Sequence, residues 1–330
     1  MSTIPTARGM IDSSQLGRVL IHEHVFLMDM EYTVNYRPDF FTDATIAAAA
    51  ERLNALKAVG IDTIVDLTVL GLGRHIPSLA KVAQHTDLNI IVSTGAYTFD
   101  AAPTPFAYYG PGLLRDGPEI MVDHFVQDIT VGIGGTAIKA GELKCAIDEP
   151  GLTKGVERVM RCVAKANRIT GTPITVHTAP RQETGLIVQQ IMADEGVDLE
   201  DLVIGHCGDA TDVDYLMTLA DKGSIRGRDR FGIHFGITTQ ERVATIAALA
   251  RRGYADRMAL SHDCCCWSDY FPSVDEYHAA MPDHHYLHIH NDVLPLLREA
   301  GVSEAQLDQM FIANPRRHFE GPAERFARRG

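Results

Sequence analysis

Residues 18–24 read Arg18-Val19-Leu20-Ile21-His22-Glu23-His24, an apolar run that ends in two histidines separated by one residue. Aliphatic and β-branched residues in a run of this length predict a buried β-strand. Because alternate residues of a strand point to the same face, His22 and His24 would face the same way and could share one metal ion. Taken alone the pair is weak support for a metal site, since two structural or surface histidines explain most such cases.

Seven more segments of the same kind follow along the chain, and this repetition decides the fold. Longer amphipathic stretches separate them, such as Asp43–Val59, whose apolar residues have helical spacing and which ends at Gly60, a favourable C-cap. Alternating strands and helices predict a parallel sheet, and eight units favour a closed (β/α)8 TIM barrel over an open doubly wound sheet, the main alternative. The further strand candidates are Thr63–Thr68, Asn89–Gly95, a segment ending in Ala140–Lys144, Pro173–Thr178, Leu202–His206, Ser224–Phe231 and Met258–Asp263.

No change of composition, linker or low-complexity tract divides the 330 residues, so we expect a single barrel domain over residues 1–330. The segment from Cys264 to about Asn291, residues 264–291, is long and irregular. It follows the eighth strand, on the barrel face where active sites lie. Long loops in compact domains are often functional, and we expect this one to be a substrate lid.

The formal net charge of −13 disfavours nucleic acid and membrane surfaces as partners, because an acidic chain repels phosphate backbones and anionic lipid. The N-terminal residues lack the basic and apolar regions of a signal peptide. No apolar run is long enough to span a bilayer. We therefore expect a cytoplasmic protein.

Several candidate strands end in side chains that can bind metal. Lys144 ends the fourth strand, His177 closes the fifth, His206 the sixth and Asp263 the eighth. Each alone has an ordinary explanation, such as a hydrogen-bonded histidine, a capping aspartate or a paired lysine. In a barrel, however, these strand ends converge on one mouth. Nitrogen and oxygen ligands without thiolate suit zinc, iron, cobalt or manganese, so the spacing predicts a metal site. It leaves Lys144 unexplained, because an ammonium group cannot bind a cation.

These motifs resemble the phosphotriesterase family of the amidohydrolase superfamily, and in particular its phosphotriesterase-like lactonase branch. The resemblance runs from about Thr6 to Phe319. The matching motifs are His22-Glu23-His24-Val25, Ala140-Gly141-Glu142-Leu143-Lys144-Cys145, Gly171-Thr172-Pro173-Ile174-Thr175-Val176-His177-Thr178, Ile204-Gly205-His206-Cys207 and Leu260-Ser261-His262-Asp263.

The resemblance implies a binuclear centre at the C-terminal ends of the strands, with two divalent ions, zinc or alternatively iron, cobalt or manganese. His22, His24 and Asp263 would hold the buried ion. His177 and His206 would hold the more exposed ion. The two ions would activate a water molecule for attack on a carbonyl or phosphoryl group.

The resemblance also assigns roles to single residues. Lys144 would bridge both ions as a carboxylated lysine, formed by carbon dioxide on its neutral amine, and Asp263 would accept the proton of the attacking water. Tyr97 resembles the tyrosine that contacts the lactone near the metals. Arg230 resembles the pocket arginine after strand seven, although a loop salt bridge with Asp229 is an equally good reading. Trp267 begins the lid and is expected to line the acyl-chain channel.

The implied activity is a lactonase that opens N-acyl-homoserine lactones, and hence quorum quenching, with weaker organophosphate triesterase activity. The alternative is a phosphotriesterase (aryldialkylphosphatase) that acts mainly on organophosphates. A third hypothesis is a catalytically silent binding barrel. It predicts that some ligands are damaged, whereas all six candidate ligands are intact in the sequence. A small-molecule ester is the expected partner, and the resemblance implies a homodimer.

Overall fold

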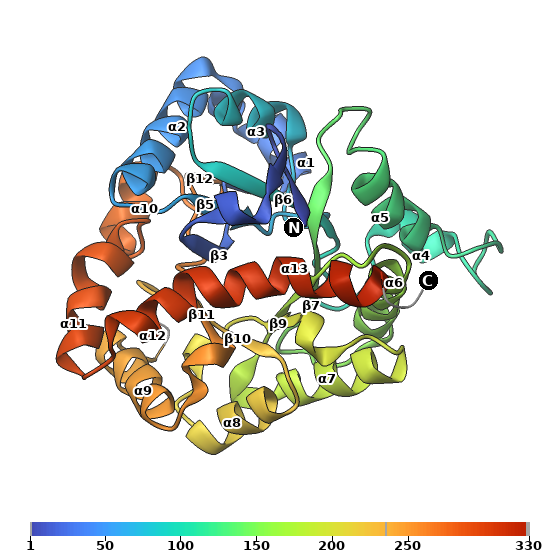
Figure 1. Cartoon of the computed structure of the whole chain (residues 1–330). Coiled ribbons are helices and arrows are strands. Elements are labelled where there is room, and N and C mark those ends of the chain that lie inside the picture. The colour runs from blue at the N-terminus through green and yellow to red at the C-terminus, as the bar shows by residue number, and fades with distance from the viewer. Residues whose placement is uncertain (1, 235, 328–330) are drawn as a thin grey trace.

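The computed structural model describes residues 2–234 and 236–327. Eight parallel strands form one sheet in the order β11-β10-β9-β8-β7-β6-β5-β3, and the helices lie around it (Figure 1). The predicted (β/α)8 TIM barrel is therefore confirmed. Its strands are β3 (Val19–Glu23), β5 (Thr63–Asp66), β6 (Asn89–Gly95), β7 (Ala140–Ile147), β8 (Ile174–Thr178), β9 (Leu202–Ile204), β10 (Ile225–Arg228) and β11 (Met258–Leu260).

The barrel strands are buried along almost their whole length, as expected for parallel strands covered by helices on one face and by the barrel interior on the other. All eight expected strands are present. The seventh is shorter than expected, because β10 ends at Arg228 and the chain then turns. β11 likewise ends at Leu260, before the expected boundary at Asp263.

Helices follow most strands, and many begin at side-chain caps. Thr153 accepts a backbone hydrogen bond at the start of α6, and Thr238 and Glu241 form a capping box at α9. The helices are α1 (Met30–Tyr36), α2 (Asp43–Ala58), α3 (Ile76–Ala83), α4 (Thr104–Tyr108), α5 (Ile120–Thr130), α6 (Lys154–Thr170), α7 (Thr184–Asp194), α8 (Val213–Asp221), α9 (Thr239–Arg251), α10 (Val274–Ala280), α11 (Leu294–Glu299), α12 (Glu304–Asp308) and α13 (Asn314–Ala327).

The barrel closes where β11 meets β3. Asp263 N donates to His22 O over 3.1 Å, and His24 N donates to Cys264 O over 2.9 Å, just beyond the end of β11. At the opposite end of the barrel, α13 crosses the strands (Figure 1), and its His318 lies 3.1 Å from Glu142 in β7. The N-terminal hairpin of β1 (Thr3–Thr6) and β2 (Gly9–Asp12) packs against β6 and β7.

The segment expected to be an irregular lid contains regular structure. Trp267–Ser268 form β12, which pairs with β4 (Phe26–Leu27), and α10 begins at Ser273, whose side chain caps it. A π-helical turn then starts at Ile289 and leads into α11. The segment is therefore more regular than expected, whereas its role as a substrate lid stays a prediction. In the described part of the chain, no helix is both long and apolar enough to cross a membrane.

Candidate metal centre

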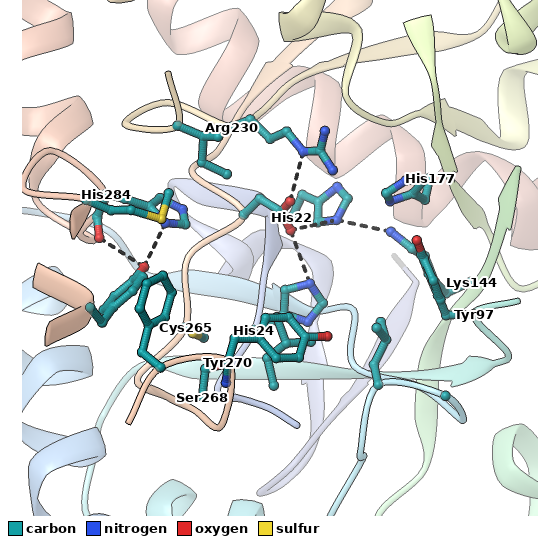
Figure 2. Close-up of a pocket in the computed structure, with 18 residues that line it drawn as sticks. His22, His24, Tyr97, Lys144, His177, Arg230, Cys265, Ser268, Tyr270 and His284 are labelled. Atoms are coloured by element: carbon teal, nitrogen blue, oxygen red, sulfur yellow. Dashed lines mark hydrogen bonds and ion pairs between the residues drawn. The ribbon is translucent and has the colours of Figure 1, made fainter. Parts of the chain in front are cut away.

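Six side chains from five strand ends lie at the mouth of the barrel. Figure 2 labels four of them, His22, His24, Lys144 and His177. His22 Nε2 lies 3.0 Å from Lys144 Nζ, and His24 Nε2 lies 3.2 Å from Asp263 Oδ1. On the other side of the lysine, His206 Nε2 lies 2.7 Å from His177 Nδ1. The structure thus brings together every residue that the sequence analysis assigned to the binuclear site. The donor atoms of His22, His24 and Asp263 lie within 4.8 Å of one another, a group that could hold a metal ion.

One buried carboxylate, Asp229, orients a histidine from each side of the site. Its Oδ2 lies 2.8 Å from His22 Nδ1 and its Oδ1 lies 3.0 Å from His206 Nδ1. An ionised carboxylate only accepts, so both of these nitrogens carry the proton. Burial alone would raise the pKa of Asp229, but interaction with His22 lowers it below its ordinary value. Asp229 therefore stays ionised and fixes the tautomer of both rings.

The other two histidines are fixed in the same way. His177 Nε2 lies 2.9 Å from Asp148 Oδ2. His24 Nδ1 lies 2.8 Å from the Thr68 hydroxyl, which itself donates to Asp66 over 2.6 Å. In each of the four rings, the nitrogen that points away from the centre of the site (the outer nitrogen) thus faces an acceptor and carries the proton. This pattern is typical of metal-binding histidines.

The inner nitrogens of the four rings consequently carry lone pairs that face the centre. Those of His177 and His206 face each other directly, and two lone pairs at this separation repel unless a cation lies beside them. Burial lowers the pKa of His22 to about 4 and that of His206 well below its ordinary value, so both are neutral at pH 7 and able to bind metal. This donor set fits divalent metal ions with nitrogen and oxygen ligands.

Lys144 lies in the middle of this group and is 1% exposed. Burial lowers its pKa from 10.5 to about 8, although Asp263 and Asp229 oppose the effect. A larger fraction of the amine is therefore neutral near pH 8 than for an exposed lysine. The neutral amine is the form that reacts with carbon dioxide, so the surroundings of Lys144 suit a carboxylated lysine.

Shortly after each of three consecutive strands, one residue other than glycine has a left-handed backbone conformation. The φ angles are +61° at His206 after β9, +69° at Arg230 after β10 and +59° at Asp263 after β11. Such residues are uncommon and cost conformational energy, and they cluster at functional sites. Here each turn directs a polar side chain to the barrel mouth rather than along the strand.

A pocket of about 450 Å³ opens above these residues. Its walls include aliphatic and aromatic side chains, namely Leu27, Leu72, Ile233, Phe271 and Met281. Its floor includes His22, His24, Lys144, His177 and Asp263.

Tyr97 and Arg230 both line the pocket beside the candidate ligands (Figure 2). Tyr97 donates its hydroxyl proton to Asp148 over 2.5 Å, and its ring meets that of His177 edge-on at 5.1 Å. Burial and this hydrogen bond raise the pKa of Tyr97, so it remains a phenol. Arg230 binds Asp209 over 2.9 Å and Asp263 over 3.2 Å.

Two expectations about substrate residues need correction. The alternative interpretation of Arg230, a salt bridge with Asp229, does not match the structure. Asp229 bonds His22 and His206, whereas Arg230 pairs with Asp209 and Asp263. Trp267 is not among the described residues that line the pocket. Its ring packs 4.8 Å from that of Phe40, with the Arg37 guanidinium over it, so it supports the wall from behind.

The histidines of residues 284–290 lie in different surroundings. His284 lines the pocket, and its Nδ1 lies 2.7 Å from the Tyr277 hydroxyl. His288 is buried, whereas His290 is exposed, as expected for residues on different faces of a helix. His285, His288 and Asp292 form a separate small group, in which His288 Nδ1 already bonds Asp292 over 2.9 Å.

We predict that Asp229→Asn weakens metal binding about 10- to 100-fold, the usual effect of removing the acceptor behind a metal-binding histidine. The asparagine oxygen can accept from only one of His22 and His206, and its amide group repels the other ring. Competition with a chelator, followed by metal analysis, measures the effect. Asp256→Asn, at a half-exposed carboxylate at the opposite end of the barrel, is the control. Equal resistance to the chelator in both variants would contradict the assigned role.

A parallel barrel with this donor set at its mouth defines the class of metal-dependent hydrolases. A sequence model of the phosphotriesterase family matches residues 2–319. The chain belongs to the phosphotriesterase family, and it is a metal-dependent hydrolase that acts on esters. Members of this family use a binuclear divalent metal centre.

Known relatives match nearly the whole chain. A protein of Mycobacterium tuberculosis named phosphotriesterase homology protein is 55% identical over 322 residues, which cover 97% of this chain and 98% of that protein. An aryldialkylphosphatase of Saccharolobus solfataricus is 37% identical over 310 residues, covering 94% and 96%. The solved structure of the phosphotriesterase from Mycobacterium tuberculosis superimposes with a TM-score of 0.94 at 54% identity, covering 97% of this chain and 98% of that one.

The sequence analysis overlooked Asp229, Asp148 and Asp209 as contributors to the site. Asp229 stands between two arginines, which suggested a salt bridge, and Asp148 begins a loop after β7. The signal that could have found them is positional: each follows the end of a barrel strand, as the candidate ligands His24, His206 and Asp263 do.

Proposed function

We propose that the enzyme opens lactones, in particular N-acyl-homoserine lactones, with weaker activity on organophosphate triesters. The observation that carries the proposal is the position of Tyr97. Asp148 holds this phenol edge-on against His177, at the border between the candidate metal ligands and an apolar pocket. A polar ring placed beside the metals and an aliphatic chain placed along Leu72, Ile233 and Met281 would match this division of the pocket.

The chain's own residues would then have distinct tasks. Asp263, whose Oδ1 lies 3.4 Å from His22 Nε2 and 3.2 Å from His24 Nε2, would accept the proton of the attacking water. Metal ions held by the six candidate ligands would supply Lewis-acid activation of the water and of the scissile group. Lys144, once carboxylated, would offer anionic oxygen ligands to these ions. Arg230, held by Asp209 and Asp263, presents a fixed positive charge to the pocket rim. Tyr97 orients the ring of the substrate.

The alternative substrate class is the organophosphate triesters, and the relative named aryldialkylphosphatase favours it. The same centre can serve both reactions, because the attack of water on a carbonyl and on a phosphoryl group needs the same activation. A silent binding barrel is disfavoured, since all six candidate ligands are present and the outer nitrogens of the four histidines are hydrogen-bonded, which leaves their inner nitrogens available for metal.

Purified, metal-loaded protein distinguishes the two classes. We expect kcat/KM for N-acyl-homoserine lactones, followed by a pH-based assay of ring opening, to exceed that for paraoxon by at least about tenfold, or about 1.4 kcal/mol. A chelated sample of the same preparation is the control for spontaneous lactone hydrolysis. A large preference for paraoxon would replace the lactonase assignment with the triesterase.

Further details of the proposal come from the resemblance. They are zinc as one of the metals that suit the centre, a homodimer, and a role in quorum quenching; the proposed cytoplasmic location comes from the composition of the sequence. Exposed aromatic side chains on α1, where Tyr36 is 70% exposed, would be covered in a dimer. Light scattering of the protein as it elutes from a size-exclusion column measures the oligomeric state, and twice the mass of one chain would support the homodimer.

A further inference from the structure

Glu23 is the last residue of β3 and lies between His22 and His24, so its side chain points to the opposite face of the strand from that of His22. It is fully buried, with no exposed area. Its Oε1 accepts from the backbone N of His262 over 2.9 Å and lies 2.8 Å from His262 Nδ1. Its Oε2 accepts from the backbone N of Cys264 over 3.0 Å. The two oxygens thus hold the amides on either side of Asp263.

Asp263 needs such support because its backbone is in the left-handed region, at a φ of +59°. A residue other than glycine holds this conformation only where its surroundings enforce it. The amide of Asp263 itself donates to His22 O over 3.1 Å. Three consecutive amides, at positions 262, 263 and 264, are therefore bound to His22 and Glu23 of β3, directly before His24.

His262 extends this connection to the far end of the lid. Its Nδ1 donates to Glu23, so its Nε2 is free to accept from the backbone N of Ile289, at 3.1 Å. The carbonyl of His262 accepts from His284 Nε2 over 3.0 Å. The Tyr286 hydroxyl donates to the carbonyl of His24. Residues 284–289, where this segment returns to the barrel, are thus bonded to His262 and to the backbone of one candidate ligand, His24.

We propose that Glu23 is a positioning residue that fixes Asp263 against His22 and His24 and, through His262, ties the C-terminal end of the lid to the same site. Glu23 does not line the pocket, so it acts only through these partners. The inference concerns metal binding and lid order. It is therefore independent of whether the substrate is a lactone or a phosphotriester.

The test compares Glu23→Gln with Glu142→Gln. Glu142 is also fully buried on a barrel strand and also pairs with a histidine, His318, but at the opposite end of the barrel. Each variant loses one buried carboxylate from a similar pair. Any general loss of stability should therefore appear in both, as a lower melting temperature.

Only Glu23→Gln should change the site. The glutamine oxygen can accept at one side of Asp263, whereas its amide group repels the donor at the other. We expect affinity for divalent metal, measured by chelator competition, to fall about 10- to 100-fold. We also expect faster amide hydrogen exchange at residues 284–289. In Glu142→Gln, both quantities should match the wild type.

Wild-type metal affinity and exchange in a folded Glu23→Gln protein would overturn the proposal, as would equal losses in the two variants. If Glu23→Gln does not fold, Glu23→Asp provides the same test. The shorter carboxylate keeps the charge but reaches only one of the two amides, so the same two measurements should change in the same direction.

Discussion

Lys144→Ala should lose most of its bound metal and at least about 10³-fold in kcat/KM, equivalent to about 4 kcal/mol of transition-state stabilisation. Lys144 Nζ lies 3.0 Å from His22 Nε2, and Lys144 is the ligand that we propose to bridge the two halves of the site. Its loss leaves neutral imidazoles and a single carboxylate to hold two divalent ions. Metal analysis of the purified variant and steady-state kinetics measure the two effects.

Chemical rescue separates the lost bridge from a general defect. A short-chain carboxylate such as propionate can enter the space left by Lys144→Ala and supply two anionic oxygens, so metal content and activity should partly return. Lys144→Arg, which is not carboxylated, should be inactive and should not respond to the acid. Lys139→Ala, at a partly exposed lysine at the other end of the same strand, should behave as wild type. Full activity of Lys144→Ala without added acid would show that no bridge is needed.

Asp263→Asn should lower kcat about 10²- to 10⁴-fold, the usual contribution of a general base, while the melting temperature changes little. Asparagine has the size of aspartate and can still offer an oxygen to a metal. It cannot accept a proton. Burial alone would raise the pKa of Asp263, but interaction with His22 and His206 holds it well below its ordinary value. The wild-type carboxylate is therefore ionised throughout the neutral range and ready to accept.

The kinetic pattern identifies the role. If Asp263 acts as the base, kcat falls much more than the metal content of the variant, since the ligand set is largely preserved. Asp275→Asn, at an exposed carboxylate in α10, is the control and should match the wild type. A loss of activity fully explained by lost metal would reduce Asp263 to a ligand alone.

The sequence predicted the barrel and the six candidate ligands because both rest on local patterns. Continuous apolar runs mark buried parallel strands, and the ligands stand at the ends of those runs, where a barrel brings distant segments together. The resemblance added what spacing could not, a bridging role for Lys144. The structure then placed each of the six side chains within 3.2 Å of another member of the set.

The residues behind the ligands were not predictable in the same way. The bonds of Asp229 to His22 and of Glu23 to Cys264 join positions more than 200 residues apart, and nothing local marks them. They also depend on left-handed turns at His206 and Asp263, and the enrichment of histidine and aspartate at such turns is too weak a signal to locate them. In the segment after β11, α10 is only seven residues long, too short for helical periodicity to stand out.

The metal ligands and the pocket walls come from different kinds of segment. The ligands sit on or directly after barrel strands, whereas Phe271 and Met281 belong to the excursion after β11. Substitutions in the pocket walls can therefore change which substrates are accepted without changing the candidate metal ligands. Substitutions confined to residues 268–281 would reshape the walls for new esters while the ligand-bearing strands keep their sequence. The bonds made by residues 284–289 set the limit beyond which such remodelling begins to disturb the reaction itself.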